Sequence, residues 1–441
     1  MSYNLYDQYR NTDIEWLGKI PQHWEISKVK YIGNYINGYA FKPSDWVGEG
    51  RKIIRIQNLT NKNAVFNYYN GKIDDKYIVR SGDILLSWSA SLGVFLWDDE
   101  EALLNQHIFK VLPNPKLVTK DFYLWLSKCF IHEMQKDTHG STMTHLTKDK
   151  FGSFVVPLPS FEEQEKISSF LDEKYSEIQQ VIDSKEKQIK TLVQYCQSLI
   201  TETVTKGLDP GAVMGDSGIE WIGKVPTHWN IKRLGFLGYL QNGISKSSND
   251  FGFGFPFLSY GDVYKSMELP KEVSGLVNSS RSDRNIYSVK KGDVFFTRTS
   301  ETIDEIGITS TCLETIDLAT FAGFLIRFRP TKNGLIPDYS KYYFRSQMHR
   351  KYFAKEMNLV TRASLNQDLL KKLPVLIPPE DEQIQISTFL DDKCSNINNL
   401  ILRNKQLIKE LKSYMESLIY EAVTGRIDVR NYTESDLEVE K

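Results

Sequence analysis

A long segment that contains neither proline nor glycine constrains this chain more than any other feature. It runs from Phe161 to Lys206, and Gly207 closes it. Apolar side chains recur along it with alternating gaps of four and three, the 3.5-residue repeat that turns one narrow helical stripe toward a partner. A helix of about 40 residues is roughly 60 Å long at ~1.5 Å per residue. Such a helix needs a partner of similar length to cover its stripe.

The same chain supplies a matching stripe 219 residues later. Each stripe carries a polar residue near its middle, Lys185 in the first and Asn404 in the second. If the two helices pack antiparallel, these residues face each other, and a polar residue in such a seam costs stability but specifies the register. A break that is merely tolerated in a hydrated seam is the alternative. The predicted seam residues are Leu171, Ile178, Ile182, Lys185, Ile189, Leu192, Leu199, Leu390, Ile397, Ile401, Asn404, Ile408, Leu411 and Leu418.

The composition is typical of a globular protein with more than one domain. The chain has 441 residues, of which 41% are hydrophobic and 25% charged, which allows two to four domains with their own cores. The sequence shows no apolar run of membrane-spanning length and no signal peptide at its start, so we expect a cytoplasmic protein without a membrane partner. The net charge of −1 excludes a generally basic coat for nucleic acid, but not a locally basic face.

The four cysteines lie far apart and form no CxxC pair. This spacing argues against a zinc ribbon and against a disulfide framework, and the scattered histidines offer no metal-ligand spacing. Cys196 and Cys394 lie on the helical stripes, where a free cysteine behaves as a small apolar side chain. We therefore expect no metal site.

The chain also repeats itself outside the helices. The signature IEWLGKIP at 14–21 returns as IEWIGKVP at 219–226, and a His-Trp pair follows each copy. SGDILL at 81–86 returns as KGDVFF at 291–296, and LPSFEEQEKISSFLDEK returns as IPPEDEQIQISTFLDDK at the start of the second long helix. An ordered duplication of this kind indicates two similar halves. The His-Trp pairs belong to the repeated frame, so we expect them to have structural roles.

Each half is predicted to hold the signature, a β-rich variable region and then a long helix. Short β-branched or aromatic runs bounded by turn residues indicate the strands. Strands are expected at 52–60, 82–90, 93–98, 107–113, 255–263, 292–299, 307–314 and 323–330, and further helices at 120–136 and 338–357.

The predicted fold class is α+β, with two similar globular domains separated by two long helices that pair within the chain, and with a pseudo-twofold internal repeat. The predicted parts are a first domain at 1–160, a central helix at 161–207, a second domain at 208–379, a C-terminal helix at 380–425 and an acidic, disordered tail at 426–441.

Together and in this order, the motifs resemble the specificity (S) subunit of type I restriction–modification enzymes across nearly the whole chain. The resemblance rests on the doubled signature, the doubled Gly-Asp strand, the doubled LPxxxEQ-type start of a heptad helix, and the helix ends TETVTKGLD and YEAVTGRID. It implies that each domain is a target recognition domain that reads one half of a split DNA sequence. It also implies that the two long helices form an antiparallel intramolecular coiled coil, which sets the spacing between the two domains, in a system of phage defence.

The resemblance further implies the partners and cofactors. Double-stranded DNA is the ligand, and two methyltransferase (M) subunits, which carry S-adenosylmethionine and methylate adenine, dock on the helices. Restriction/translocase (R) subunits, which use ATP and Mg, join for cleavage, while the S subunit has no catalytic site and binds no cofactor. This chain agrees, because it contains no [DN]PP[YFW] tetrapeptide and no GxxxxGK[ST] phosphate loop. We therefore expect a non-catalytic subunit.

DNA recognition requires cationic or amide side chains at base edges and small polar groups or cations at phosphates. Trp88 and Arg298 follow the doubled Gly-Asp strand at matched positions but differ in type, as expected for two different half-sites, although Trp88 also suits a core position. For each candidate the alternative is a solvated side chain or a turn hydrogen bond. The predicted contacts are Tyr39, Lys42, Arg55, Gln57, Asn58, Trp88, Ser89, His139, Ser141, Thr142, His145, Ser245, Lys246, Ser247, Arg281, Arg284, Arg298, Thr299, Arg362 and Asn366.

Two other functions remain open at this point. A coiled-coil scaffold that binds only protein partners is compatible with the modest net charge and the lack of a basic run. A self-sufficient nuclease would need clustered carboxylates with a lysine, which the sequence does not bring together. Neither the bases of a half-site nor the spacer length follows from one sequence.

Overall fold

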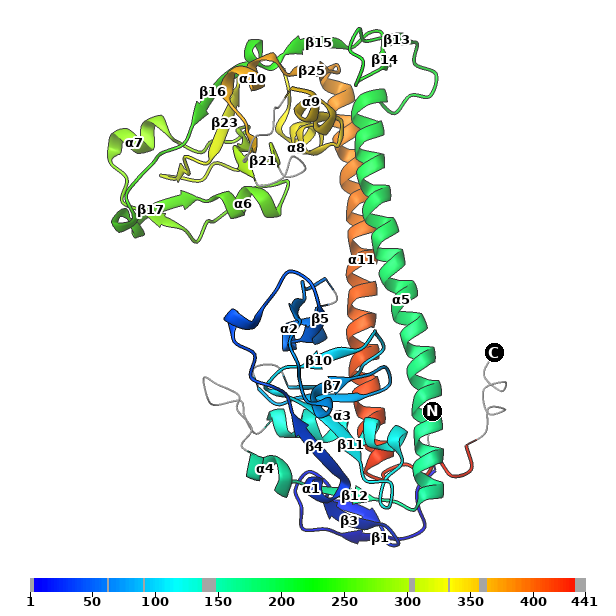
Figure 1. Ribbon diagram of the computed structural model, residues 1–441. Helices are drawn as coiled ribbons and strands as arrows, with labels where there is room; N and C mark the ends of the chain where they lie inside the picture. Colours follow the sequence, from blue (N-terminus) through cyan, green and yellow to red (C-terminus); the bar gives the residue numbers. More distant parts are fainter. Residues whose placement is uncertain are drawn as a thin grey trace. The chain divides into compact units, whose positions relative to one another are not determined.

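The structure is a computed structural model that describes residues 4–61, 63–89, 92–136, 148–300, 306–331, 334–356 and 363–432. The chain divides into two compact units (Figure 1). Unit 1 contains Met1–Lys185 and Gln406–Lys441, and unit 2 contains Glu186–Lys405. Unit 1 is thus assembled from the two ends of the chain, and each long helix contributes one segment to each unit.

The two long helices begin where the sequence predicts them. They are α5 (Phe161–Lys206) and α11 (Glu380–Val423). Acidic residues in the first turn of each helix interact favourably with the positive end of the helix dipole. Gly207, with φ 76°, and Gly425, with φ 71°, follow the helices in a left-handed backbone that glycine adopts without strain, which ends the helical path.

Within each unit the two helix segments pack along the predicted stripe. In unit 1, Ile178 of α5 shares a core with Leu418 of α11, and in unit 2, Ile200 shares a core with Leu390. The start of α5 therefore packs on the end of α11, and the end of α5 on the start of α11, so the pairing is antiparallel (Figure 1). Every residue of the predicted seam is buried or half-buried.

The polar residues in the middle of the two stripes are both half-buried. Lys185 is the last residue of its segment in unit 1, whereas Asn404 belongs to unit 2. Their pairing across the seam therefore stays a prediction.

Unit 1 contains two four-stranded sheets. The first has the order β4-β11-β8-β9 with all neighbours antiparallel, and the second has the order β6-β5-β10-β7 with β5 and β10 parallel. The strands are β4 (Gly33–Asn37), β11 (Ile108–Pro113), β8 (Ile84–Ser87), β9 (Gly93–Leu96), β6 (Asn67–Tyr69), β5 (Arg51–Ile54), β10 (Ala102–Leu104) and β7 (Ile78–Val79). Helix α3 (Lys120–Lys136) buries Phe122, Leu126 and Phe130 in one core with residues of the first sheet.

Unit 2 repeats this plan. Its first sheet has the order β16-β23-β19-β21, again antiparallel throughout, and its second has the order β18-β17-β22 with β17 and β22 parallel. The strands are β16 (Gly238–Asn242), β23 (Leu325–Pro330), β19 (Val294–Thr297), β21 (Thr309–Thr311), β18 (Leu276–Val277), β17 (Phe251–Leu258) and β22 (Thr320–Phe321). The internal repeat predicted from the sequence is thus confirmed in the strand order.

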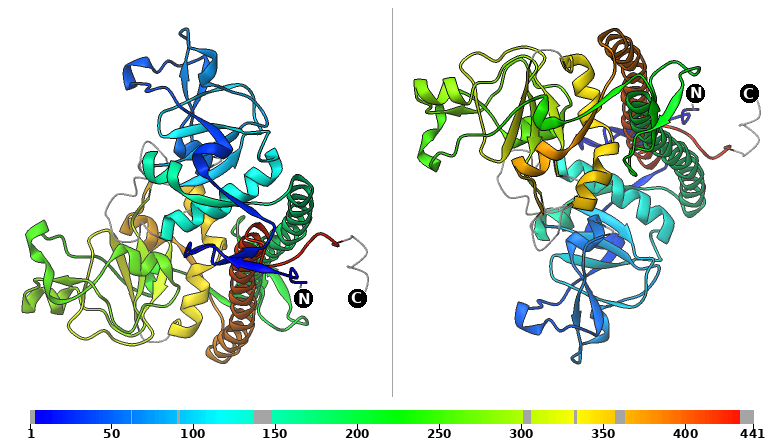
Figure 2. Two further views of the ribbon diagram at one scale, coloured as in Figure 1. Left: turned by 90° about the horizontal axis from the view of Figure 1, so that it is seen from below. Right: turned by 90° about the horizontal axis from the view of Figure 1, so that it is seen from above.

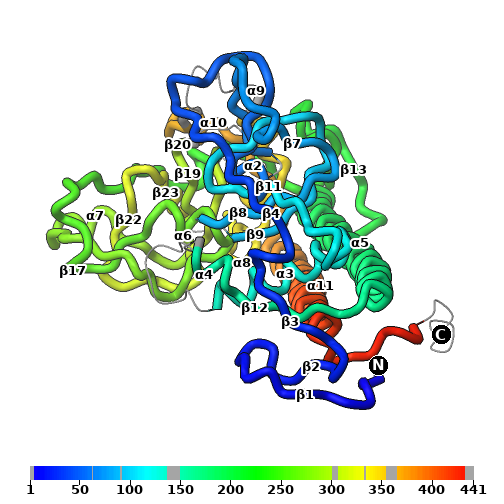
Figure 3. The backbone as a smooth tube through the Cα atoms, turned by 60° about the horizontal axis from the view of Figure 1, so that its bottom comes forward, coloured from blue at the N-terminus to red at the C-terminus, as the bar shows by residue number. Residues whose placement is uncertain are grey.

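The duplicated signature forms a hairpin in each unit, followed by a strand that pairs with the strand before the long helix. Figure 3 traces the first copy from β1 and β2 into β3. The elements are β1 (Tyr9–Asn11), β2 (Lys19–Pro21), β3 (Glu25–Lys28) and β12 (Val155–Leu158) in unit 1, and β13 (Met214–Asp216), β14 (Lys224–Pro226), β15 (Asn230–Arg233) and β25 (Pro374–Ile377) in unit 2.

Three predicted segments are wrong in detail, and side-chain caps account for two of them. The strand predicted at 52–60 ends at Ile54, where Asn58 accepts a hydrogen bond from the Arg55 N–H and α2 (Ile56–Thr60) begins. The strand predicted at 255–263 ends at Leu258, because Ser259 caps α6 (Tyr260–Lys265). The helix predicted at 338–357 is two helices, α8 (Pro337–Arg345) and α9 (Met348–Glu356), separated by the extended backbone of Ser346.

Short elements complete the two units. They are α1 (Val29–Ile32), α4 (Lys148–Ser153), α7 (Arg281–Ile286), α10 (Gln367–Lys372), β20 (Thr299–Ser300), β24 (Ala363–Ser364) and the 3-10 turns Pro43–Asp45, Asp75–Tyr77, Leu234–Phe236 and Ser248–Asp250.

The tail predicted to be disordered from 426 is wrong over 426–432. Ile427 and Val429 are buried in the core of unit 1, and the N–H of Asp428 donates to the carbonyl of Asn4. Figure 2, which looks along the two helices, shows the first residues of the chain in blue beside the red segment that follows α11. The sequence did not indicate this contact, because its apolar residues, Ile427, Val429 and Tyr432, are separated by polar ones.

Candidate nucleic-acid interface

Each unit has a close backbone crossing beside its predicted DNA contacts. A Cβ atom at Gly38 would lie 2.0 Å from the carbonyl oxygen of Asn105, and one at Gly243 would lie 2.1 Å from that of Ala322. A parallel bridge between the two crossing segments follows each glycine. Only glycine fits such an approach, which explains why this residue recurs in the two halves.

In unit 1, Tyr39 and Trp88 both lie at this crossing. The Tyr39 carbonyl accepts from the Gln106 N–H, and the Trp88 N–H donates to the carbonyl of His107. The indole of Trp88 donates from Nε1 to Asn37 Oδ1 over 3.2 Å and stacks on Phe109 with ring centroids 5.7 Å apart. Trp88 is half-buried against the core, so the structure gives it the packing role that the sequence left open.

The remaining candidates of unit 1 are either engaged or buried within the unit, or exposed to solvent. Arg55 donates from Nη1 to Asn67, and Asn58 closes a helix turn, so both already serve the fold. Ser89 is buried. Tyr39, Lys42 and Gln57 are exposed to solvent and can reach a ligand.

In unit 2 the segment after Gly243 meets helix α7. The ammonium of Lys246 lies 3.0 Å from the carboxylate of Asp283, and the guanidinium of Arg284 lies 3.6 Å from the ring centre of Phe255. Arg281, on the same helix, is exposed. Ser245 and Ser247 are exposed as well, and Ser247 donates to Asp250.

Strand β20 gathers the remaining candidates of unit 2. The Leu365 N–H donates to the carbonyl of Arg298, and Thr299 pairs with Ser364, so both lie near Asn366. Asn366 is exposed but accepts a hydrogen bond from the Leu369 N–H as the cap of α10. Nε of Arg298 is buried and has no hydrogen-bond partner among the described residues.

Five predicted contacts fall on parts of the chain that the structure does not describe. They are His139, Ser141, Thr142, His145 and Arg362.

The duplicated Gly-Asp motif binds a cation in each unit, buried in unit 1 and half-buried in unit 2. Asp83 lies 2.7 Å from the ammonium of Lys110, which is 8% exposed. Asp293 binds Arg329 through both carboxylate oxygens, to Nε and to Nη2, over 2.6 Å each. Each aspartate also closes the turn before its strand by accepting a backbone N–H three residues earlier. The aspartates therefore position the strands that lead to Trp88 and Arg298.

The duplicated His-Trp pair anchors the start of α5 in unit 1. His23 Nε2 and Trp24 Nε1 lie 2.9 and 3.1 Å from Oε1 of Glu163, and Ser160 donates to Oε2 of the same carboxylate. Burial alone would raise the pKa of Glu163, but these hydrogen bonds hold it below its usual value.

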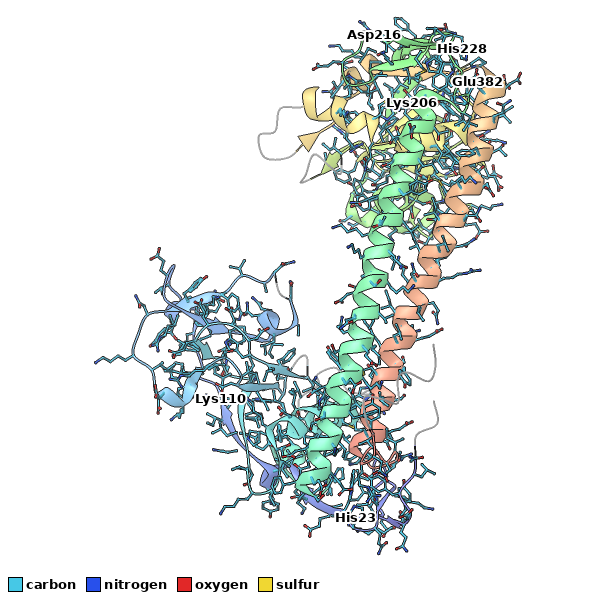
Figure 4. All side chains as sticks on the ribbon, turned by 90° about the vertical axis from the view of Figure 1, so that its right-hand side faces the viewer. His23, Lys110, Lys206, Asp216, His228 and Glu382 are labelled. Carbon is cyan, nitrogen blue, oxygen red and sulfur yellow. The ribbon has the colours of Figure 1, made fainter. Side chains whose placement is uncertain are left out.

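The same anchor recurs at the start of α11. His228 Nε2 lies 2.6 Å from Oε1 of Glu382, and Trp229 Nε1 donates to Oε2 over 2.9 Å. Figure 4 shows His228 and Glu382 next to each other at this helix start. The structural roles predicted for the His-Trp pairs are therefore confirmed.

The glutamine that follows each anchoring glutamate holds the loop before α3 in unit 1 and the loop before α8 in unit 2. Gln164 donates to the carbonyls of Leu117 and Pro159 and accepts from the Thr119 N–H. Gln383 makes the same three hydrogen bonds, with Gly334, Pro378 and Ile336. The sequence showed the repeated Glu-Gln pair but not these roles, which its exact recurrence in the two halves could have suggested.

Replacing Glu163 with glutamine is expected to destabilise the chain by about 1.5–3 kcal/mol at neutral pH, because hydrogen bonds to a charged group are lost. The lowered pKa makes this contribution complete above the unfolded value of 4.5, and it is lost as the pH falls through the folded-state pKa. Urea unfolding at several pH values measures the difference. The control is Glu162→Gln in the same turn, where the side chain is exposed and only its interaction with the helix dipole, below about 1 kcal/mol, is lost. Parallel pH profiles for wild type and Glu163→Gln would contradict the assignment.

Two features are absent from the described part of the chain. It contains no cluster of three or more His, Cys, Asp or Glu residues that could hold a metal ion. Nor is any described helix long and apolar enough to cross a membrane.

Comparison with known proteins identifies relatives over both halves. The family model for the type I restriction modification DNA specificity domain matches residues 21–191 and 226–413. The specificity subunit of type I restriction enzyme EcoBI from Escherichia coli is 21% identical over 432 residues, which covers 94% of this chain and 88% of that protein. The EcoKI specificity subunit of Escherichia coli strain K12 is 23% identical over 434 residues, with 93% and 90% covered.

A solved structure supports the fold. A chain from a study of complex assembly and conformational transition of the type I R-M system superposes with a TM-score of 0.67 at 15% identity, covering 92% of this chain and 98% of that chain. Because the family model spans most of both halves, the protein belongs to the family of the type I restriction modification DNA specificity domain.

Proposed function

We propose that the protein is the DNA-reading subunit of a type I restriction–modification complex, in which each unit recognises one half of a bipartite site in double-stranded DNA. The observation that carries the proposal is one sheet order, built twice, with different side chains at equivalent places. Four residues after the glycine of the backbone crossing, unit 1 exposes Lys42 and unit 2 exposes Ser247. A shared scaffold with different side chains suits two readers of different sequences.

The exposed candidates are the proposed contacts to DNA. They combine an aromatic ring, cations, amides and hydroxyls, which suit base edges and phosphates. They are Tyr39, Lys42, Gln57, Ser245, Ser247, Arg281 and Asn366.

The chemistry is proposed to come from partners. Methyltransferase subunits would bring S-adenosylmethionine, and restriction subunits would bring ATP and Mg, while this chain would bind none of these. The outer faces of α5 and α11 are the proposed docking surface for the methyltransferase subunits. Exposed apolar side chains on these helices support this, among them Tyr195, 56% exposed, and Leu402, 62% exposed.

Matched insertion of one heptad into both helices is expected to lengthen the spacer of the DNA site without changing its half-sites. Cys196 faces Cys394, so Ile189, one heptad earlier, lies opposite Ile401, one heptad later. Seven residues inserted after each of these positions add about 10 Å of helix, which corresponds to about three base pairs of DNA. Methylation-site mapping of cells that express the variant with its cognate methyltransferase measures spacer and half-sites together.

A control insertion of seven residues after Gly211, in an exposed turn outside the helices, should leave the spacer as it is. Altered half-sites with an unchanged spacer would contradict the proposal. If the assembled complex bound DNA equally well whatever the DNA sequence, a protein-binding scaffold would be favoured instead. Cleavage of DNA by the purified chain with Mg²⁺ alone would indicate a nuclease, and we expect none.

A further inference from the structure

Two cysteines meet in the seam between the long helices of unit 2. The Sγ atoms of Cys196 on α5 and Cys394 on α11 lie 3.3 Å apart. This contact is not part of the internal repeat, because the residues at the corresponding positions of unit 1 are Tyr175 and Met415. The pair therefore needs an explanation other than the packing that both halves share.

The geometry is close to that of a disulfide. A disulfide requires an S–S distance of about 2.05 Å, so the two sulfur atoms must approach by roughly 1.3 Å. Both side chains lie on helices that are already packed together, and both cysteines are free thiols. Small rotations of the two side chains can supply this movement without unfolding either helix.

The two sulfurs differ in access and in acidity. Cys196 is half-buried, whereas Cys394 is 3% exposed. The hydrogen bond between the two thiols lowers the pKa of Cys196 below its usual value, although burial opposes the shift. A thiolate attacks a disulfide far faster than a thiol does, so the more accessible sulfur is also the more nucleophilic one at neutral pH.

We propose that Cys196 and Cys394 are a redox modification site that closes into a reversible disulfide across the helix pair when the protein meets a small-molecule disulfide. The Cys196 thiolate attacks one sulfur of the oxidant and releases its other half as a thiolate, which takes up a proton. Cys394 then loses its proton and attacks the mixed disulfide at Cys196, which releases the second half. Two protein thiols are oxidised, and one small disulfide is reduced to two thiols.

The bond would enclose a loop that contains the sheets of unit 2, from β13 to β25. Closing so long a loop restricts the unfolded chain strongly, so the oxidised form resists unfolding more than the reduced form. The proposal does not depend on DNA binding, and its test is separate from the test of the proposed function.

The test exposes the full-length chain to oxidised glutathione, removes the reagent and counts free thiols. The count should fall from four to two, and peptide mapping without reduction should recover one cross-linked peptide pair that contains Cys196 and Cys394. Dithiothreitol should restore all thiols. The thermal midpoint of the oxidised chain should exceed that of the reduced chain by about 5–15 °C.

Matched variants separate this pair from the other thiols. Cys129 and Cys312 are buried, and burial raises the pKa of both. Cys129→Ser and Cys312→Ser should still lose two thiols, whereas Cys196→Ser and Cys394→Ser should form no internal bond. The double variant Cys196→Ser/Cys394→Ser should melt at the same temperature with and without oxidant. Retention of all four thiols in the wild type, or glutathione bound at Cys196 without closure, would overturn the proposal.

Discussion

Replacing Leu390 with aspartate is expected to unfold unit 2 under conditions in which the wild type is folded. Leu390 is 0% exposed in the core that α11 shares with α5 and with the sheet of unit 2. Loss of a buried leucine side chain costs about 2–5 kcal/mol, and a carboxylate in the same apolar space adds several more. A domain is stable by only about 5–15 kcal/mol in total. Far-UV circular dichroism with urea unfolding of the full chain measures the loss.

Leu402→Asp is the matched control, because it makes the same substitution on the same helix within unit 2. Leu402 is 62% exposed, so its replacement removes little buried surface and leaves the new charge in water. We expect unfolding transitions that overlap those of the wild type. Equal destabilisation by the two substitutions would show that the seam is not the packed interface described above.

Replacing Asp293 with alanine should destabilise unit 2 by about 3–5 kcal/mol, because it leaves the half-buried Arg329 without its ion pair and the buried Arg327 without a nearby negative charge. Asp293 is 0% exposed and binds Arg329 through two hydrogen bonds of 2.6 Å. Burial also lowers the pKa of the neighbouring Arg327 to about 10, and the Asp293 carboxylate opposes that shift. Removing the carboxylate therefore leaves the guanidinium of Arg327 in the interior with less negative charge near it. Urea unfolding with a probe in unit 2 measures the effect.

A second substitution tests the reason for this loss. Arg329→Met in the Asp293→Ala background removes the orphaned cation and should recover part of the stability. The control is Glu314→Gln in the ion pair with Lys271, whose side chains are 60% and 78% exposed, and no measurable change is expected there. An Asp293→Ala variant as stable as the control would mean that the Gly-Asp motif does not hold the strand.

The long helices show what could be predicted from the sequence alone. Their apolar stripes come from a local sequence repeat. The first helix contains no proline or glycine that would end it before Gly207. The pairing of the two helices followed from two stripes of equal length in one chain, whereas the antiparallel direction was implied by the family resemblance. Local caps were harder, because Asn58 and Ser259 turned two predicted strands into short helices through single hydrogen bonds.

The candidate contacts show the opposite case. Arg55, Asn58 and Lys246 have the right chemistry for DNA, but each is engaged by a partner within its own unit. The choice between a surface contact and an internal one depends on which segments the fold brings together. A sequence pattern does not contain that information for residues that occur once.

The sequence by itself determined the two helices, their apolar stripes and the duplication of the whole plan, because periodicity and repetition are properties of the chain alone. Only the tertiary structure decided what the repeated polar residues do: Glu163 and Glu382 bind the His-Trp pairs, and Asp83 and Asp293 bind cations. It also brought Cys196 to Cys394. These roles join residues that are far apart in sequence. Their partners become known only when hydrogen-bond geometry and burial bring the segments together.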